Sequence, residues 1–141
     1  MLIGISPVLG PDLLHALRAM GHGDEIALVD GNYPAADHAR RLVRADGLDM
    51  LTMLGAVLGV LPIEAAFRAA LNNDPAQASA IHHQIDAMML ASRFAQPAKP
   101  LSGADLYPRI KSAFAIVATS ERVPYANVIL RKGVIALADP V

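Results

Sequence analysis

The stretch MGHGDEIALVDGNYP, from Met20 to Pro34, places a short apolar run between two polar loops. The run EIALV, Glu25 to Val29, is typical of a strand buried in a sheet, and glycines and ionisable residues flank it on both sides. Loop residues at the ends of a rigid strand are solvated and free to carry chemistry. The stretch therefore predicts a buried strand with candidate functional residues at its ends.

Helical and strand patterns alternate along the rest of the chain. Apolar spacing and capping residues predict helices over 11–20, from a cap at Asp46 to Gly59, from a cap at Asp74 through 75–89, and from a cap at Ser102 over 104–113. Short apolar runs predict further strands over 115–119, 126–131 and 134–138. This order favours an α/β fold in which residues 1–141 form a single compact three-layer domain, with helices packed around a mixed β-sheet.

Composition excludes several classes of protein. The net charge of -1 gives no overall field that would collect nucleic acid or anionic lipid. The chain has no cysteine, which excludes disulfides, thiolate metal sites and a cysteine nucleophile. The longest apolar stretch, Met50 to Ile63, is shorter than the roughly 18 to 20 residues that a membrane span requires. We therefore expect a cytoplasmic protein whose partner is a small molecule, with no nucleic acid and no membrane involved.

The apolar content also predicts self-association. Hydrophobic residues make up 54% of the chain, although only 4% are aromatic. A domain of this size buries about two-thirds of the surface of its unfolded chain. So high an apolar fraction indicates that further surface is buried against copies of the same chain. We expect a homo-oligomer.

The five histidines invite a metal-site interpretation, which their spacing does not favour. His82 and His83 are adjacent, so their side chains point about 100° apart on a helix. His82 and Asp86 share one helix face, but such a pair is more typical of a solvated surface. His15 and His38 are also interpreted as surface residues. We predict no metal, and the sequence has no phosphate-binding or dinucleotide-binding motif that would hold a cofactor.

His22 differs because it lies between Gly21 and Gly23. The glycines remove neighbouring bulk, so the imidazole can face an open cavity, where a histidine exchanges protons near neutral pH. The alternative is a histidine that caps the preceding helix. Asp24 is either a supporting carboxylate that orients the ring or a turn residue.

Asp30 lies at the opposite end of the expected strand and suits hydrogen bonding to ligand hydroxyls. The alternative is a turn in which the Asp30 carboxylate bonds the local backbone near Gly31. His22 and Asp30 lie roughly 20 Å apart along an extended chain. A site that uses both therefore needs either a glycine turn that folds His22 back along the sheet or a neighbouring subunit.

The segment ERVPYANVIL, Glu121 to Leu130, offers a phenol and an amide two residues apart. If the backbone is extended, Tyr125 and Asn127 project to one face and can grip a polyol. The alternative is a tyrosine packed in the sheet and an asparagine in a turn. The residues by themselves do not decide between these two interpretations.

These stretches together closely resemble the L-fucose mutarotase and D-ribose pyranase family. The ordered set that carries the resemblance is MGHGDEI, the Asp30 loop with YPA, VRADGL, AFAIV, the segment from Glu121 to Asn127, and L.KGV near the end. HGDEI and RADG are more similar to the fucose mutarotase branch, whereas YAN occurs among ribose pyranases. The resemblance implies a compact α/β domain that assembles into ring-like homo-oligomers, commonly decamers, with sites between subunits.

The resemblance implies an isomerase that interconverts the α and β anomers of L-fucose or a related monosaccharide by opening and reclosing its hemiacetal ring, without a cofactor. It implies that His22 is the catalytic acid and base. It further implies that Asp30, Tyr125, Ala126 and Asn127 bind the sugar. A D-ribose pyranase, which interconverts pyranose and furanose forms, and a non-catalytic sugar-binding protein accessory to uptake are the alternatives.

One position departs from the family pattern. Members usually carry an arginine or histidine that touches the sugar just before the helix preceding AFAIV, and an ungapped alignment places Gly103 there. Lys99, Tyr107 and Arg109 are candidates to replace it, although none matches by motif. The departure bears on the identity of the sugar more than on the type of reaction.

Overall fold

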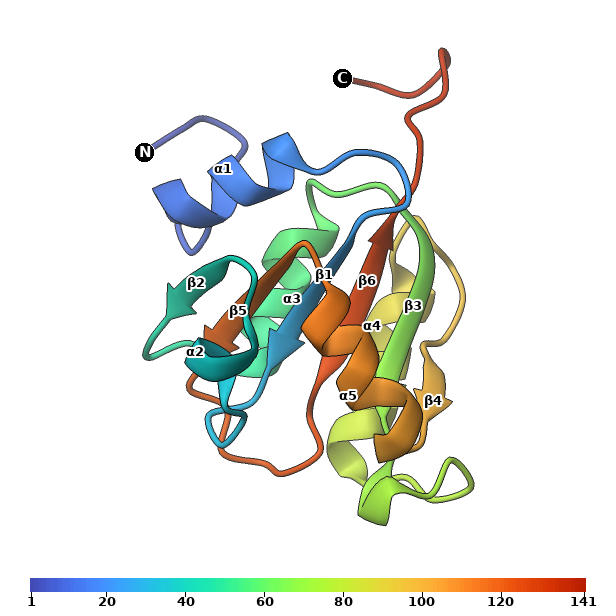
Figure 1. Ribbon diagram of the computed structural model, residues 1–141. Helices are drawn as coiled ribbons and strands as arrows, with labels where there is room; N and C mark the ends of the chain where they lie inside the picture. The colour runs from blue at the N-terminus through green and yellow to red at the C-terminus, as the bar shows by residue number, and fades with distance from the viewer.

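The predicted buried strand is β1 (Glu25–Val29) in the computed structural model, which describes all 141 residues of the chain. β1 belongs to a six-stranded sheet with the order β2-β5-β1-β6-β3-β4 (Figure 1). β6 (Val128–Lys132) runs antiparallel to its neighbours β1 and β3, whereas the other neighbouring strands pair in parallel. The predicted mixed sheet is confirmed.

The remaining elements connect and cover these strands. The other strands are β2 (Leu42–Ala45), β3 (Ile63–Ala69), β4 (Lys99–Leu101) and β5 (Ala115–Thr119). The helices are α1 (Pro11–Ala19), α2 (Ala35–His38), α3 (Met50–Leu58), α4 (Ala80–Ala91) and α5 (Gly103–Ser112), with a short 3-10 turn, η1, over Leu71–Asn73. None of these helices has the length and apolar character needed to cross a bilayer.

Helices cover both faces of the sheet, which confirms the predicted three layers (Figure 1). Because side chains alternate along a strand, β1 supplies both layers of the core. Ile26 and Leu28 pack with α1, α3 and α4, whereas Ala27 and Val29 pack with α2 and α5. All four side chains are fully buried, as expected for a strand covered on both faces.

The structure corrects the predicted start of two helices. α3 begins at Met50 because the carboxylate of Asp49, not Asp46, accepts the N–H of Thr52. Asp74 caps no helix: its carboxylate accepts the N–H of Ala76, which favours a local turn over a helical start. α4 begins only at Ala80, after Ser79.

The strands near the C-terminus also differ from their prediction. Residues 134–138 form no strand, because the chain leaves the sheet at Gly133, where its N–H donates to Pro62 ahead of β3. β2 and β3 were not predicted as strands. In β3, Glu64 and the buried Arg68 interrupt the apolar pattern, and pairing with β6 decides the conformation instead.

A core substitution tests the central role of β6. Leu130→Ala removes a fully buried side chain, and we expect the free energy of unfolding to fall by about 2 to 5 kcal/mol because a cavity is left between packed layers. Leu137→Ala, on a fully exposed leucine in the C-terminal tail, is the matched control and is expected to change it by less than about 0.5 kcal/mol. Urea unfolding followed by circular dichroism measures both, and equal effects of the two substitutions would contradict the described packing.

Candidate active site

The register of β1 and β6 brings Asp30 and Asn127 together. Leu28 pairs with Val128 in antiparallel orientation, so the end of β1 lies beside the beginning of β6. The backbone N–H of Asp30 donates to the side-chain oxygen of Asn127 at 2.8 Å. Asn127 makes no other side-chain hydrogen bond, so its NH2 group is available to a ligand. The structure thus unites two of the predicted sugar ligands.

The Asp30 carboxylate is buried and held by backbone amides. Burial raises the pKa of Asp30 above its usual value, and the charge of Glu121 acts in the same direction. The N–H of Asn32 donates to the carboxylate at 3.0 Å, which is the local turn given above as the alternative interpretation of Asp30. This bond and the nearby backbone N–H groups of Ala126 and Tyr33 oppose the shift by stabilising the charged form. Such a carboxylate has fixed orientation, which suits it to accept hydrogen bonds from sugar hydroxyls.

Asp30 borders a hollow of about 370 Å³ whose wall also includes Tyr33, Arg44 and Thr119. A second hollow, of about 440 Å³ and lined only by polar residues and glycine, shares Gly31, Arg44 and Thr119 with the first. Ligand sites in proteins have volumes of about 300 to 1,000 Å³. The end of the sheet that carries Asp30 therefore has room for a monosaccharide and polar groups to bind it.

Tyr33 closes one side of the first hollow. Its hydroxyl lies 2.8 Å from Nδ1 of His38, and its ring stacks on Tyr107 with centroids 5.9 Å apart. Burial raises the pKa of Tyr33 to about 12, so the phenol stays neutral near neutral pH. His38 was interpreted as a surface residue, but this contact places it partly inside the protein.

Tyr125 and Asn127 do not project from an extended segment. Tyr125 has a φ of +60°, in the left-handed region, so the backbone turns there before β6 begins at Val128. Ala126 is fully buried in this turn, and Asn127 is nearly so. The prediction that the two side chains share a face was wrong, because it assumed extended backbone. Asn127 in a turn, the alternative interpretation, is what the structure shows.

His82 lies beneath this turn and is not on a solvated surface. It is fully buried on α4, and its Nε2 lies 2.7 Å from the carbonyl oxygen of Tyr125. Asp86, on the same face of α4, forms an ion pair with Arg68 of β3. The sequence interpretation of this pair as solvated was wrong, because Arg68 was not recognised as an inward-pointing strand residue.

His22 lies at the other end of the sheet, and its side chain is 60% exposed. Its Nε2 lies 2.7 Å from Oε2 of Glu64, at the start of β3. Asp24 instead accepts the N–H of Gly21 at 2.7 Å, so it stabilises the turn rather than contacting the imidazole. The sequence did not indicate Glu64 as a site residue, because β3 was not predicted as a strand and 42 positions separate Glu64 from His22.

The glycine turn does not fold His22 back toward Asp30. The N–H of Gly23, whose φ is +86°, donates to the carbonyl of Lys132, at the far end of β6 from Asn127. His22 and Asp30 therefore lie beyond opposite ends of β1, roughly 20 Å apart. In Figure 1 the loop from α1 to β1 and the loops that follow β1 and β5 lie at opposite ends of the sheet. One copy of the chain brings together Asp30, Ala126 and Asn127, but not His22.

The space beside Gly103 is occupied by neighbouring side chains. A Cβ atom at Gly103 would lie 2.8 Å from Oδ1 of Asn73 and 3.2 Å from Tyr107. Of the three candidates to replace the missing arginine or histidine, Arg109 is used by an ion pair with Glu25, and Lys99 is exposed on β4. Tyr107 is the remaining candidate, because it stacks on Tyr33, which lines the hollow beside Asp30.

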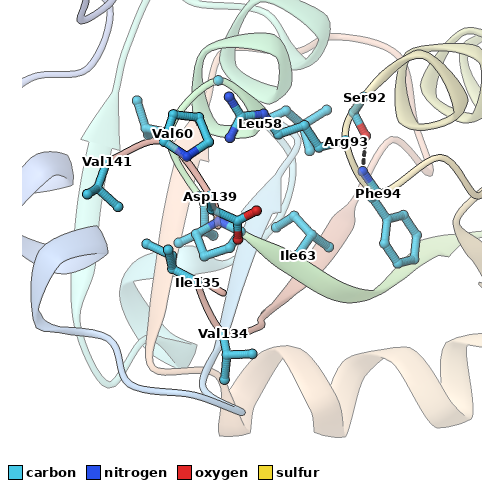
Figure 2. A pocket seen from close by; sticks show the side chains of 14 residues that line it. Leu58, Val60, Ile63, Ser92, Arg93, Phe94, Val134, Ile135, Asp139 and Val141 are labelled. Carbon is cyan, nitrogen blue, oxygen red and sulfur yellow. Dashed lines mark hydrogen bonds between the residues drawn. The ribbon is translucent and has the colours of Figure 1, made fainter. Parts of the chain in front are cut away.

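A hollow of about 480 Å³ lies elsewhere, between the C-terminal tail and the ends of α3 and α4 (Figure 2). Leu58, Ile63, Phe94 and Val134 are among the apolar side chains that line it, and it contains none of the predicted site residues (Figure 2). The histidine, aspartate and glutamate side chains form no cluster of three or more that could hold a metal ion. The chemistry therefore points to the hollows beside Asp30.

The buried carboxylate of Asp30 has a consequence for stability. Because its folded-state pKa is raised, ionisation of Asp30 destabilises the folded chain as the pH rises from about 3.8 through the raised value. Relative to Asp30→Asn, the wild type should lose free energy of unfolding over that window, at no more than about 1.4 kcal/mol per pH unit. Urea unfolding across a pH series measures the difference, and Asp12→Asn, at an exposed position on α1, is the control. A difference that grows in favour of the wild type with rising pH would contradict this assignment.

Comparisons with known proteins identify relatives of this chain. The RbsD / FucU transport protein family matches residues 3–135. The fucose mutarotase of Mus musculus is 38% identical over 145 residues, which cover 95% of each chain. The L-fucose mutarotase of Haemophilus influenzae is 35% identical over 140 residues, which cover 95% of this chain and 97% of the relative.

Solved structures show the same architecture. The crystal structure of the fucose mutarotase from Streptococcus pneumoniae, in complex with L-fucose, superimposes with a TM-score of 0.79 at 34% identity, covering 96% of this chain and all of that one. The family match spans nearly the whole chain, and the fold and the relatives agree with it. This chain therefore belongs to the RbsD / FucU transport protein family.

Proposed function

We propose that this protein is a mutarotase, an isomerase that interconverts the α and β anomers of L-fucose or a related monosaccharide. The observation that carries the proposal is the buried Asp30 carboxylate, held by backbone amides beside hollows of monosaccharide size. Relatives named fucose mutarotase, 33–38% identical over nearly the whole chain, support this substrate class.

The proposed reaction needs only proton transfer. One proton must leave the anomeric hydroxyl and another must reach the ring oxygen, after which the open chain recloses on the other face of its carbonyl. A positioned acid and base typically accelerates such a step by about 10²- to 10⁴-fold, or roughly 3 to 5 kcal/mol. Sugars already open slowly in water, so this contribution is sufficient. In the proposal His22 moves the proton while Asp30 and Asn127 hold the hydroxyls.

The proposed site is shared between two copies of the chain. His22 is exposed beyond one end of β1 and Asp30 lies beyond the other, so His22 must approach the Asp30 of a neighbour. Exposed apolar side chains at both ends of the chain favour self-association; they include Met1, Leu2, Ile3, Val134, Ile135 and Val141. The resemblance to ring-forming family members makes a cytoplasmic decamer with sites at its subunit interfaces part of this proposal.

In the proposal Glu64 takes the supporting role that was one of the two interpretations of Asp24. Its carboxylate lies within hydrogen-bond distance of Nε2 of His22, so it can hold the ring orientation or accept a proton from it. The position of Gly103 bears on the choice of sugar. Asn73 and Tyr107 fill the space there, so in the proposal they, rather than an arginine or histidine, face the sugar.

The central test is the loss of His22. His22→Ala should slow anomer exchange of L-fucose by about 10²- to 10⁴-fold, because proton transfer loses its carrier. Saturation-transfer NMR measures the exchange directly, with D-ribose compared in the same assay. His15→Ala, which removes an exposed histidine on α1, is the control and should leave the rate unchanged. Sugar binding without any acceleration in the wild type would favour the non-catalytic alternative.

Mixing two inactive variants tests whether the site is shared. In oligomers co-assembled from His22→Ala and Asp30→Asn chains, each site draws its histidine from one copy and its aspartate from another. Random pairing should restore about a quarter of the wild-type exchange rate, although each variant alone is inactive. Co-expressed chains with different affinity tags provide the mixed oligomers. If the mixture stays as inactive as its parents, His22 and Asp30 do not meet across an interface.

A further inference from the structure

A buried polar cluster lies beneath the turn at Tyr125–Asn127 and has no part in the proton transfer proposed above. It consists of His82 and Asp86 on α4 and Arg68 on β3. Nε and Nη2 of Arg68 each lie 3.0 Å from an oxygen of Asp86, and His82 is fully buried beside them. Burying so many polar groups is unfavourable unless their hydrogen bonds are satisfied. The cluster is therefore expected to have a role in the structure or in the reaction.

Both ring nitrogens of His82 are used, and their partners define its tautomer. Nδ1 lies 3.0 Å from the backbone nitrogen of Ser79, whose N–H can only donate. Nδ1 is thus the acceptor, and the proton resides on Nε2, which donates to the carbonyl oxygen of Tyr125 at 2.7 Å. The imidazole therefore links the first turn of α4 to the turn before β6.

The surroundings of His82 favour this neutral form. Burial holds the pKa of His82 below its usual value, and the charges of Arg68 and His83 act in the same direction. The hydrogen bond to the Tyr125 carbonyl and the charge of Asp86 oppose the shift without overcoming it. Protonation would give both ring nitrogens a hydrogen and remove the acceptor that Ser79 needs.

His82 and Asp30 hold opposite sides of one peptide group. The carbonyl of Tyr125 and the N–H of Ala126 belong to the same planar trans unit, so they point in opposite directions. The carbonyl is bonded by His82, and the N–H stabilises the Asp30 carboxylate. Tyr125 has a φ of +60°, which a residue with a side chain adopts only when surrounding contacts impose it.

We propose that His82 is a positioning residue for the sugar-binding turn: its Nε2–H holds the Tyr125 carbonyl and thereby fixes the turn that points the Ala126 N–H toward Asp30 and places the Asn127 side chain on the backbone N–H of Asp30. This inference rests on the proposed sugar site at Asp30 and Asn127. His82 touches neither the sugar nor the transferred proton in this role. It fixes the orientation of the groups that bind the hydroxyls.

Two substitutions separate the two hydrogen bonds of His82. In His82→Gln the side-chain NH2 lies near the place of Nε2, so the bond to Tyr125 is kept and the bond to Ser79 is lost. In His82→Asn the shorter amide lies near the place of Nδ1, so the bond to Ser79 is kept and the bond to Tyr125 is lost. His83→Asn, at the exposed neighbouring histidine of α4, is the matched control.

If His82 positions the turn, His82→Asn should raise the KM for anomer exchange about tenfold or more with a smaller change in kcat, because binding groups rather than the proton carrier are displaced. His82→Gln and His83→Asn should stay near the wild type. If His82 serves only to begin α4, His82→Gln is the more damaged variant, and that result would overturn the proposal. His82→Phe, which keeps the ring volume without donor or acceptor, replaces His82→Asn if that variant does not fold.

A second readout needs no sugar. In His82→Asn or His82→Phe, the Ala126 N–H should leave Asp30, so the Asp30 carboxyl should titrate at a higher pH and the amide resonance of Ala126 should shift. Carbon-13 and nitrogen-15 NMR of the labelled chains measure both, and unchanged signals would overturn the positioning role. A wild-type chain that accelerates exchange of no sugar, but shows these shifts in its variants, would contradict the proposed function and leave the role of His82 intact.

Discussion

The antiparallel pairing of β1 with β6 is the constraint on which the candidate site depends. Because the two strands run in opposite directions, the end of β1 meets the beginning of β6, and Asp30 bonds Asn127 there. The same pairing sends the other end of β6 toward Gly23, which fixes His22 at the far side of the sheet. One register therefore unites the proposed sugar-binding groups and separates them from the proposed proton carrier.

That separation connects catalysis to assembly. A single copy holds a carboxylate without the histidine at one end, and an exposed histidine paired with Glu64 at the other. In the proposed function each copy supplies one half of a site at each end, and contact between copies completes it. Exposed apolar side chains at both chain ends provide surface for such contact, so activity and oligomer formation are expected to depend on each other.

Buried polar side chains beneath the turn before β6 can fix the conformation of the candidate site without contacting a ligand. No side-chain nitrogen or oxygen that is fully shielded from solvent lacks a hydrogen-bond partner. Beneath the turn Arg68 bonds Asp86, and His82, one helical turn from Asp86 on α4, bonds the peptide between Tyr125 and Ala126. In a low-dielectric interior such bonds are strong and directional, which lets them impose a left-handed conformation on Tyr125.

The sequence by itself determined the buried strand β1, the three layers and the local helix starts at Pro11 and Ser102, because the spacing of apolar residues and helix capping depend on near neighbours. It also indicated Asp30 and Asn127 as candidate site residues, but it did not predict the hydrogen bond between them. Only the tertiary structure decided β3, the left-handed turn at Tyr125 and the partners of His22 and His82. Those features depend on strand register and on contacts between residues more than 40 positions apart, which no local pattern records.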